Sequence, residues 1–329
     1  MTEHPPTAEH RFAHTHEPPT VGLTRSFDDL SPTVRTIATD AVVSRDHSVP
    51  VALCAIAGTV ATHIEDQVAT GTVLQTTADN TVPETPAERL EAASPTELEG
   101  VLEAASLLEA YVQIRVALLE SDRYSEDEQR DAAILASDFL HAAAYEPIAD
   151  CGVPARRASE LYQVLTSGSG TLAVQFLHAE GAETEQELSA VDANGDTDGS
   201  AHADNTNESM PPQAVLGGIT ATLGATAVGA SAEIRTALER YGQSLSAVLC
   251  QASSESVPAD RHETTVRALA GETGPTPTET DNCCPTTETH LERAREACHT
   301  LEGCLGSTGD RGPLAYLERA TRIPFHHES

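Results

Sequence analysis

Carboxylates near residue 120 are the first side chains of this chain that suggest chemistry. Glu120 and Asp122 offer oxygen ligands of the kind that Mg²⁺ prefers. Acidic residues four apart share one face of a helix, whereas a spacing of two turns their side chains apart by roughly 200°. Arg123 follows directly and would oppose a cation at close range. The pattern therefore predicts that this segment provides no Mg²⁺ clamp.

Other recognisable catalytic patterns are missing from the sequence. All 19 basic residues are arginine, so neither a Schiff-base lysine nor a P-loop lysine is present. No G-x-S-x-G, H-E-x-x-H or G-x-G-x-x-G string occurs. The spacing of Cys283, Cys284, Cys298 and Cys304 does not match the C-x₂₋₄-C knuckles of structural zinc sites. We therefore predict no bound metal and no cofactor.

Acidity is spread over the whole chain. Its 329 residues include 51 acidic and 19 basic ones, which gives a formal charge of −32. Such a charge is typical of adaptation to a high-salt cytoplasm, where salt screens the self-repulsion. It argues against nucleic acid or anionic lipid as a partner, because no basic stripe exists to neutralise phosphates. No segment reaches the roughly 20 consecutive apolar residues that span a bilayer. We expect a cytoplasmic protein without a membrane-spanning segment.

Helical periodicity dominates the apolar pattern. Apolar residues recur at threes and fours from Leu98 to Leu119, and a helix-start signal precedes them. Further helices are predicted at residues 49–63, 132–148, 154–180, 213–252, 286–305 and 314–322, and no strand pattern occurs. We predict a disordered tail at 1–25 and one all-α helical domain at 26–329. Two polar interruptions are predicted within it, a flexible acidic insertion at 182–212 and a break at 253–285.

Several short motifs resemble those of one enzyme family and occur in its order. Residues 131–145, DAAILASDFLHAAAY, resemble A-I-L-A-G-D-x-L-x-x-x-A. Tyr241-Gly242-x-x-Leu245 resembles Y-G-x-x-L-G, and Gln251 falls close to the glutamine of F-Q-x-x-D-D. These are motifs of the trans-isoprenyl diphosphate synthases, which the chain resembles over about residues 26–325. The resemblance implies an isoprenoid-synthase-like helical bundle.

The resemblance also implies that the metal site has been lost. In active members of the family, two aspartate-rich motifs face each other across the bundle and hold Mg²⁺ against a diphosphate. The first motif corresponds here to Leu119, Glu120, Ser121, Asp122 and Arg123. The second corresponds to Ser253, Ser254 and Glu255. Because the paired acids are missing from both segments, the resemblance implies a degenerate site with no catalytic residue and no Mg²⁺.

The family's basic contacts to diphosphate are replaced as well. If Pro50 is the proline of the family's G-K-x-x-R-P motif, Asp46 occupies the lysine position and Val49 the arginine position. The family's K-T pair aligns near Gly217-Gly218. The resemblance therefore implies that neither contact is made.

Four other polar residues are candidates to line the cavity of such a bundle, namely Arg115, Asp138, Gln175 and Gln251. Asp138 is either a polar group at the cavity or a buried aspartate that a neighbouring helix satisfies, and we favour the second. Gln175 resembles the glutamine of the family's G-Q motif. Gln175 and Gln251 either line the cavity or bridge helices.

Three functions are compatible with these features. The leading one is a polyprenyl synthetase-like protein of isoprenoid biosynthesis that is catalytically degenerate. It would act as a non-catalytic partner or regulator, in a homodimer or in a heterodimer with an active prenyl synthase. The second is an active prenyltransferase with displaced Mg²⁺ ligands at Glu120, Asp122 and Asp138, and with Arg115 and Arg123 as phosphate contacts. The third is an unrelated helical interaction protein whose similarity is coincidental.

Overall fold

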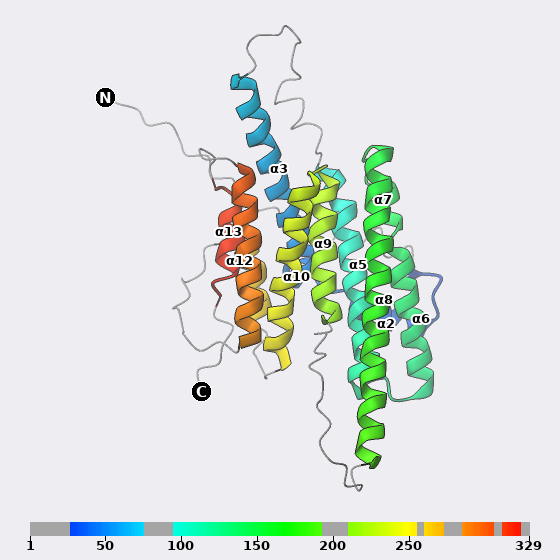
Figure 1. Cartoon of the computed structure of the whole chain (residues 1–329). Coiled ribbons are helices and arrows are strands. Elements are labelled where there is room, and N and C mark those ends of the chain that lie inside the picture. Colours follow the sequence, from blue (N-terminus) through cyan, green and yellow to red (C-terminus); the bar gives the residue numbers. More distant parts are fainter. Residues whose placement is uncertain are drawn as a thin grey trace, which may run out of the picture.

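The computed structural model describes residues 27–75, 95–192, 210–254, 260–272, 285–305 and 311–323. Every regular element in these ranges is a helix, which confirms the all-α prediction. In chain order they are α2 (Pro32–Ala41), η1 (Arg45–His47), α3 (Val49–Gln75), α5 (Pro95–Glu120), η2 (Asp122–Tyr124), α6 (Asp127–Ala143), α7 (Glu146–Asp150), α8 (Ala155–Asp192), α9 (Pro212–Ala227), α10 (Ala232–Ser254), α11 (Asp260–Leu269), α12 (Pro285–Leu305) and α13 (Leu314–Ala320). Figure 1 shows the long helices side by side, with α9 between α10 and α5.

Helix α9 is the central helix of the bundle. It packs against α3, α5, α8 and α10, and all its residues from Ala214 to Ala227 except Thr222 are buried. Leu223 joins a hydrophobic cluster with side chains of α2, α5, α6 and α8. Ala221 joins another cluster with side chains of α3, α10, α12 and α13. A helix that is apolar on every side must be covered by other elements on every side. Helix α9 therefore contacts both clusters and joins the two halves of the core.

Glycines on two sides of α9 allow its neighbours to approach closely. A Cβ atom on Gly224 would lie 1.9 Å from the carbonyl oxygen of Cys54 on α3. On the side of α10, a Cβ atom on Gly242 would lie 2.3 Å from the carbonyl oxygen of Gly217. Glycine within a helix costs roughly 1 kcal/mol relative to alanine. The close backbone contacts explain why α9 and α10 carry glycine at these positions.

The single helix predicted at 213–252 is divided into α9 and α10. The chain turns at Gly229, whose φ of +78° lies in the left-handed region that favours glycine. Arg157 of α8 donates a hydrogen bond of 3.1 Å to the carbonyl oxygen of Ala227, which satisfies an acceptor at the end of α9. The break is therefore stabilised by a residue from another helix.

Two predicted interruptions contain helical structure. The helix predicted to end near residue 180 continues as α8 to Asp192, so the first part of the insertion predicted at 182–212 is helical. Helix α11 lies within the break predicted at 253–285. Residues 193–209 of the insertion and the predicted tail at 1–25 lie outside the described residues.

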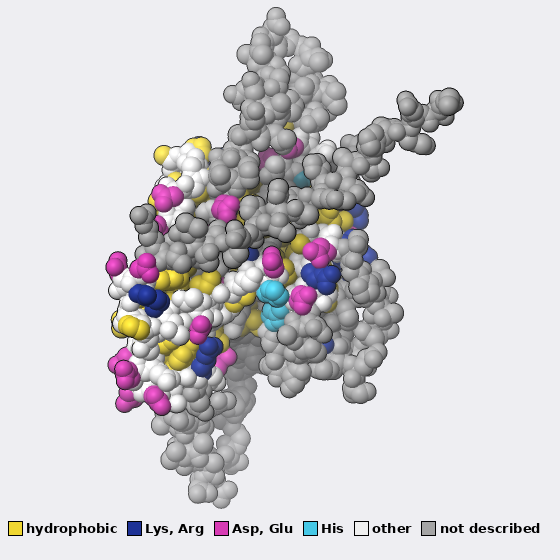
Figure 2. Space-filling view, turned by 180° about the vertical axis from the view of Figure 1, so that it is seen from behind, with side chains coloured by type: hydrophobic (Ala, Val, Ile, Leu, Met, Phe, Trp, Pro, Cys, Tyr) yellow, Lys and Arg dark blue, Asp and Glu magenta, His cyan; other side chains and the backbone are white. Residues whose placement is uncertain are grey.

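Charged side chains cover much of the outside of the bundle. Figure 2 shows acidic and arginine side chains interspersed on one face, with hydrophobic side chains exposed between them. Surface ion pairs such as Arg156–Glu160 and Arg311–Glu302, both at 3.2 Å, join many of the arginines to carboxylates. Among the described residues, no helix is both long enough and apolar enough to cross a membrane.

Gly224→Ala should destabilise the bundle, because the new methyl group has to displace the α3 backbone at Cys54. We expect a loss of about 2 kcal/mol in the free energy of unfolding, measured by urea denaturation in high salt. Gly170→Ala is the matched control, since a Cβ atom there meets nothing within 4 Å and alanine is the better helix former. Equal effects of the two substitutions would contradict the close approach of α3 and α9.

Candidate functional site

A cavity of about 720 Å³ lies between the C-terminal halves of α5 and α10, and the starts of α3, α9 and α11 complete its wall. Its polar lining consists of Glu109, Gln113 and Glu120 from α5, Ser246, Cys250 and Gln251 from α10, Gln213 from α9, His47 from η1, and His262 from α11. No arginine lies among the described residues that line it. The cavity therefore offers carboxyl, amide, thiol and imidazole groups without a guanidinium.

Glu109 is a buried acid in the wall of this cavity, with 8% of its surface exposed. The Ser48 hydroxyl donates a hydrogen bond to its Oε2, and Gln113 Nε2 donates one of 3.4 Å to its Oε1. Burial raises the pKa of Glu109 to about 7, and the two hydrogen bonds offset only part of that effect. The carboxyl group is therefore substantially protonated at neutral pH.

Ser48 links Glu109 to the start of α3. Its hydroxyl oxygen accepts a hydrogen bond of 3.1 Å from the backbone N–H of Val51, as an N-cap residue does. The same hydroxyl donates to Glu109 on α5. One side chain thus caps α3 and fixes the position of the buried acid.

Glu109 and Gln113 are four residues apart on α5, so their side chains share one face of the helix. The first aspartate-rich motif of the family that the sequence resembles is D-D-x-x-D, in which the first and last acids have the same spacing. The segment predicted as the counterpart of that motif, Leu119–Arg123, lies at the end of the same helix. Among its described side chains, only Glu120 lines the cavity.

The rest of that segment makes local contacts. Leu119 packs against a hydrophobic cluster of the core. Ser121 Oγ accepts a hydrogen bond of 3.4 Å from the backbone N–H of Arg123. The guanidinium of Arg123 lies 5.6 Å from the centroid of the Tyr124 ring. The side chain of Asp122 lies outside the described part of the structure.

The end of α10 lies across the cavity from the end of α5. Cys250 and Gln251 line the cavity together with Glu120. Burial raises the pKa of Cys250 to about 12, and the negative charge of Glu120 adds to this shift. Gln251 also accepts a hydrogen bond of 3.0 Å from Thr287 Oγ1, so it both lines the cavity and bridges α10 to α12. Glu120 of the first predicted segment and Gln251, which precedes the second, therefore line one cavity.

The second predicted motif begins at the end of α10. Ser253 and Ser254 form the last residues of α10, and only their backbone is described. Glu255 lies outside the described residues. The assignment of these three residues therefore stays a prediction.

Arg115 and Asp138 lie outside the cavity and contact each other. Arg115 Nη2 is 2.5 Å from Asp138 Oδ1, in an ion pair that joins α5 to α6. A neighbouring helix satisfies Asp138, as expected, but 59% of its side chain is exposed, so it is not the buried aspartate that we favoured. Gln175 lies on α8, away from the residues that line the cavity. Of the four cavity candidates, Gln251 alone lines it.

The residues at the positions expected for diphosphate contacts are not basic. Val49 lines it with an apolar side chain, and Asp46 is not among its lining residues. Gly217 is covered by α10, because a Cβ atom there would lie 2.0 Å from Ser246 Oγ. On α9 the cavity is lined by Gln213 and Leu216.

The described side chains of the cavity do not fit a Mg²⁺ ion. Mg²⁺ prefers several oxygen ligands in octahedral array, whereas only two carboxyl groups, those of Glu109 and Glu120, are among the described lining residues. Gln113 presents an amide on the same helix face. Within the described residues, histidine, cysteine and acidic side chains form no group of three or more that could hold a metal ion.

Reasoning from the sequence missed Glu109, Gln113, His47 and His262. A signal was present for the first two, because both interrupt the apolar stripe of residues 98–119 at a spacing of four. No pattern marks His47 and His262, which come from η1 and α11 and meet only in the folded chain.

Comparison with known proteins finds similarity at the level of structure. A geranylgeranyl pyrophosphate synthetase from Pyrococcus horikoshii matches with a TM-score of 0.52 and 12% identity, over 91% of this chain and 91% of its own. A geranylgeranyl pyrophosphate synthetase from the archaeon Geoglobus acetivorans matches with a TM-score of 0.46 and 13% identity, over 91% of this chain and 94% of its own. No protein-family model and no curated protein matches the sequence. The chain therefore has the all-helical fold of a prenyl synthase.

Glu109→Gln should remove a pH-dependent loss of stability. Folding raises the pKa of this carboxyl from 4.5 to about 7, so the folded state holds an extra proton within that window. The free energy of unfolding therefore falls as pH rises through it. Relative to the variant, the natural protein should lose about 2 kcal/mol of stability between pH 5 and pH 8 in urea titrations at constant high salt.

The control for this measurement is Glu128→Gln, at an exposed position near the start of α6. It removes the same negative charge without removing a buried acid, so it reports any general effect of lowering the net charge. If Glu109→Gln and Glu128→Gln showed the same pH profile, the raised pKa of Glu109 would be wrong.

Proposed function

We propose that this chain is a polyprenyl synthetase-like protein of isoprenoid biosynthesis that is catalytically degenerate. It acts as a non-catalytic partner or regulator of an active prenyl synthase. The supporting observation is the cavity between α5 and α10, in which a prenyl synthase fold carries Glu109, Gln113 and Gln251 but no arginine among its described lining residues.

The chemistry of prenyl transfer explains why this observation matters. Diphosphate leaves only when its developing negative charge is stabilised by a metal ion or by basic side chains. In the cavity, Glu109 is a partly protonated acid, and Glu120 adds a carboxylate that would repel a diphosphate. The two arginines nearest in sequence to Glu120 have contacts of their own, Arg115 with Asp138 and Arg123 with Tyr124. The charges of the cavity thus favour the degenerate protein over the active enzyme.

An active prenyltransferase with displaced ligands is the alternative. It would need Glu120, Asp122 and Asp138 to share a metal ion. The ion pair between Asp138 and Arg115 lies outside the cavity that Glu120 lines, which speaks against such a shared site.

Exposed apolar side chains on α6 and α8 support the binding of a protein partner. Leu135 of α6, and Val174 and Leu177 of α8, are large apolar side chains with 59%, 49% and 67% of their surface exposed. Apolar side chains that gather on a surface are typical of protein interfaces. We propose that an active prenyl synthase of the same fold covers them in a heterodimer.

The relative position of α6 and α8 places Leu135 at the same height along the bundle as Val174 and Leu177. His141 Nε2 of α6 lies 2.7 Å from Ser169 Oγ of α8, and beyond the end of α6 the Tyr145 ring stacks on Tyr162 with centroids 6.2 Å apart. The two helices therefore run antiparallel. Continuing this antiparallel register from His141 brings Leu135 level with the segment of α8 that carries Val174 and Leu177.

Calorimetry tests the loss of the diphosphate site. We expect no magnesium-dependent heat when geranyl or farnesyl diphosphate is titrated into the protein in molar KCl. The described lining residues of the cavity include neither the paired acids that would hold Mg²⁺ nor an arginine that would bind the diphosphate. Micromolar binding that requires Mg²⁺ would contradict the proposal. A radiolabelled prenyl-transfer assay with Mg²⁺ or Mn²⁺ should likewise yield no elongated product, and product that Glu120→Ala abolishes would establish the active-enzyme alternative.

Copurification tests the partner. A tagged chain expressed in its native organism should recover a prenyl synthase in molar KCl, identified by mass spectrometry. Leu135→Glu combined with Leu177→Glu should abolish this recovery, because two charges would be buried in an apolar contact. Val68→Glu is the control, since Val68 is also an exposed apolar residue but lies on α3. Failure to recover a prenyl synthase would contradict the heterodimer. If the purified chain forms a dimer that the same two leucine substitutions abolish, the surface is a homodimer interface instead.

A further inference from the structure

Glu109 is the one acidic residue of the described chain that is buried. Its carboxyl group accepts hydrogen bonds from Ser48 and Gln113, but no basic side chain among the described residues pairs with it. A buried acid is usually paired, because an ionised carboxylate without a cation is costly in a protein interior. Glu109 lines the cavity of about 720 Å³, which is therefore the place from which a cation can pair with it.

Glu120 lines the same cavity further along α5. It follows Glu109 by eleven residues, which is about three helical turns, so both residues lie on the same face of the helix. With a rise of about 1.5 Å per residue, the two positions are roughly 16 Å apart along the helix axis. Glu120 is exposed, and it forms no ion pair with a described residue. The cavity therefore has one carboxyl group in its wall and a second one near solvent, in line along α5.

Other described lining residues suit an aliphatic chain that carries N–H groups. Val112 and Leu216 give the wall apolar surface, and Gln213 presents an amide. Ser246 of α10 lines the cavity with 5% of its surface exposed, and its Oγ has no hydrogen-bond partner among the described residues. A buried hydroxyl without a partner is unfavourable, and an N–H group of a ligand is a partner for its oxygen.

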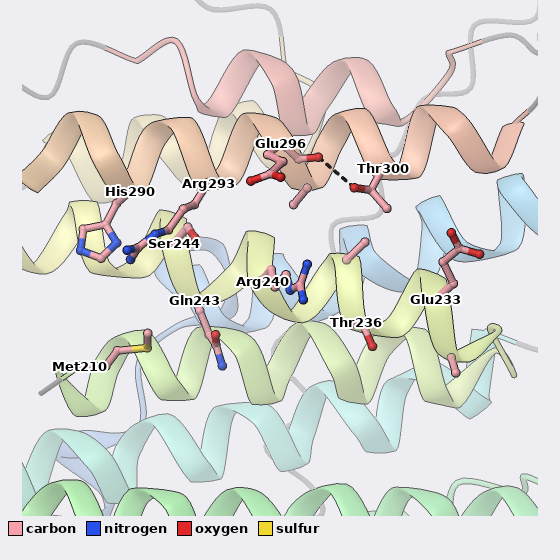
Figure 3. Close-up of a pocket in the computed structure, with 13 residues that line it drawn as sticks. Met210, Glu233, Thr236, Arg240, Gln243, Ser244, His290, Arg293, Glu296 and Thr300 are labelled. Carbon is pink, nitrogen blue, oxygen red and sulfur yellow. Dashed lines mark hydrogen bonds between the residues drawn. The ribbon is translucent and has the colours of Figure 1, made fainter. Parts of the chain in front are cut away.

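A groove of about 620 Å³ between α10 and α12 provides a contrast in charge. Arg240 and Arg293 line it together with Glu233 and Glu296, so both signs of charge are present. Figure 3 shows these four side chains spread along the groove. The described lining of the cavity beside α5 includes carboxyl groups but no arginine, so its charge favours a cation.

We propose that this cavity binds a linear aliphatic amine with an ammonium group at each end, one at Glu109 and the other near Glu120. An ammonium group has three N–H donors, and a carboxylate keeps acceptor sites beyond the hydrogen bonds from Ser48 and Gln113. The methylene chain between the two ammonium groups packs against the apolar wall, as the stems of long cationic side chains do.

The spacing and exposure of the two acids select this class of ligand. A single small cation cannot contact carboxyl groups that are roughly 16 Å apart on one helix, whereas a long diamine spans them. An anion would meet the carboxylate of Glu120 and no arginine among the described lining residues. Glu109 provides the stronger contact, because salt screens an exposed pair far more than a buried one.

The proposed amine site rests on the proposed function in one respect, that the cavity does not hold a diphosphate with Mg²⁺. Titrations with amines contain neither of these, so the two proposals fail separately. Lack of amine binding would overturn the amine site alone, whereas Mg²⁺-dependent binding of geranyl diphosphate would overturn the proposed function.

The experiment is a calorimetric titration of linear diamines into the full chain at pH 8 in molar KCl without Mg²⁺. At this pH Glu109 is above its pKa of about 7, and primary amines are still protonated. The diamine with twelve methylene groups should bind saturably, and putrescine, which is too short to reach both acids, should bind about tenfold more weakly. Glu109→Gln should weaken binding of the long diamine about tenfold, and Glu120→Gln about threefold.

Glu128→Gln is the matched control, because it removes the same charge from an exposed position outside the cavity. Its affinity for the long diamine should equal that of the natural protein. The long diamine should also raise the Tm of the natural protein and of Glu128→Gln, but not of Glu109→Gln, which is expected to fold because it loses only a carboxylate that burial disfavours. Absence of saturable binding, full affinity in Glu109→Gln, or an equal loss in Glu128→Gln would overturn the proposal.

Discussion

Backbone contact around α9 is the constraint on which the bundle depends. Gly224 lets α9 touch α3 at Cys54, and Gly217 with Gly242 lets it touch α10. Small residues on these sides set short distances between helix axes, whereas larger side chains such as Leu223 face α5 and α8. The cavity lies where this packing ends, near the starts of α3 and α9 and beside the C-terminal halves of α5 and α10. The width of the cavity therefore depends on how closely α9 approaches α3 and α10.

The chemistry of the cavity depends on how deeply its acids are buried. Glu109 and Glu120 are carboxyl groups of the same helix, but only Glu109 is buried. Burial raises the pKa of Glu109 to about 7. An ionised carboxylate is costly in an apolar surrounding, so burial favours the protonated form of Glu109. Ser48 and Gln113 donate hydrogen bonds to its two oxygens, which favours the ionised form and offsets part of the effect of burial. The pKa of Glu109 is thus set by two opposing effects, of which burial is the larger.

On the outer surface, in contrast to the cavity, many arginines are paired with carboxylates. A chain with 19 arginines and 51 acidic residues can pair most of its arginines, and many described ones are paired. Exposed pairs of this kind contribute little to stability individually and less at high salt. Arg130 and Arg157 lie outside such pairs and donate instead to the backbone carbonyl oxygens of Leu118 and Ala227, near the ends of other helices.

Local periodicity was enough to predict that the chain is helical, since the spacing of apolar residues along α5 and α12 reflects a 3.6-residue repeat that each segment carries by itself. Short motifs in residues 131–145 and 241–251 were enough to predict the prenyl synthase fold. The same periodicity could not locate the break at Gly229, because α9 is apolar on every side and continues the pattern without a gap. Nor could it select Glu109 over Glu120 as the buried acid, or exclude Asp138 from the cavity, because both outcomes depend on which neighbouring helix covers a given face. Helix formation is a property of adjacent residues, whereas burial, pKa and the composition of a cavity arise from side chains that are distant in the chain and meet only when the helices pack.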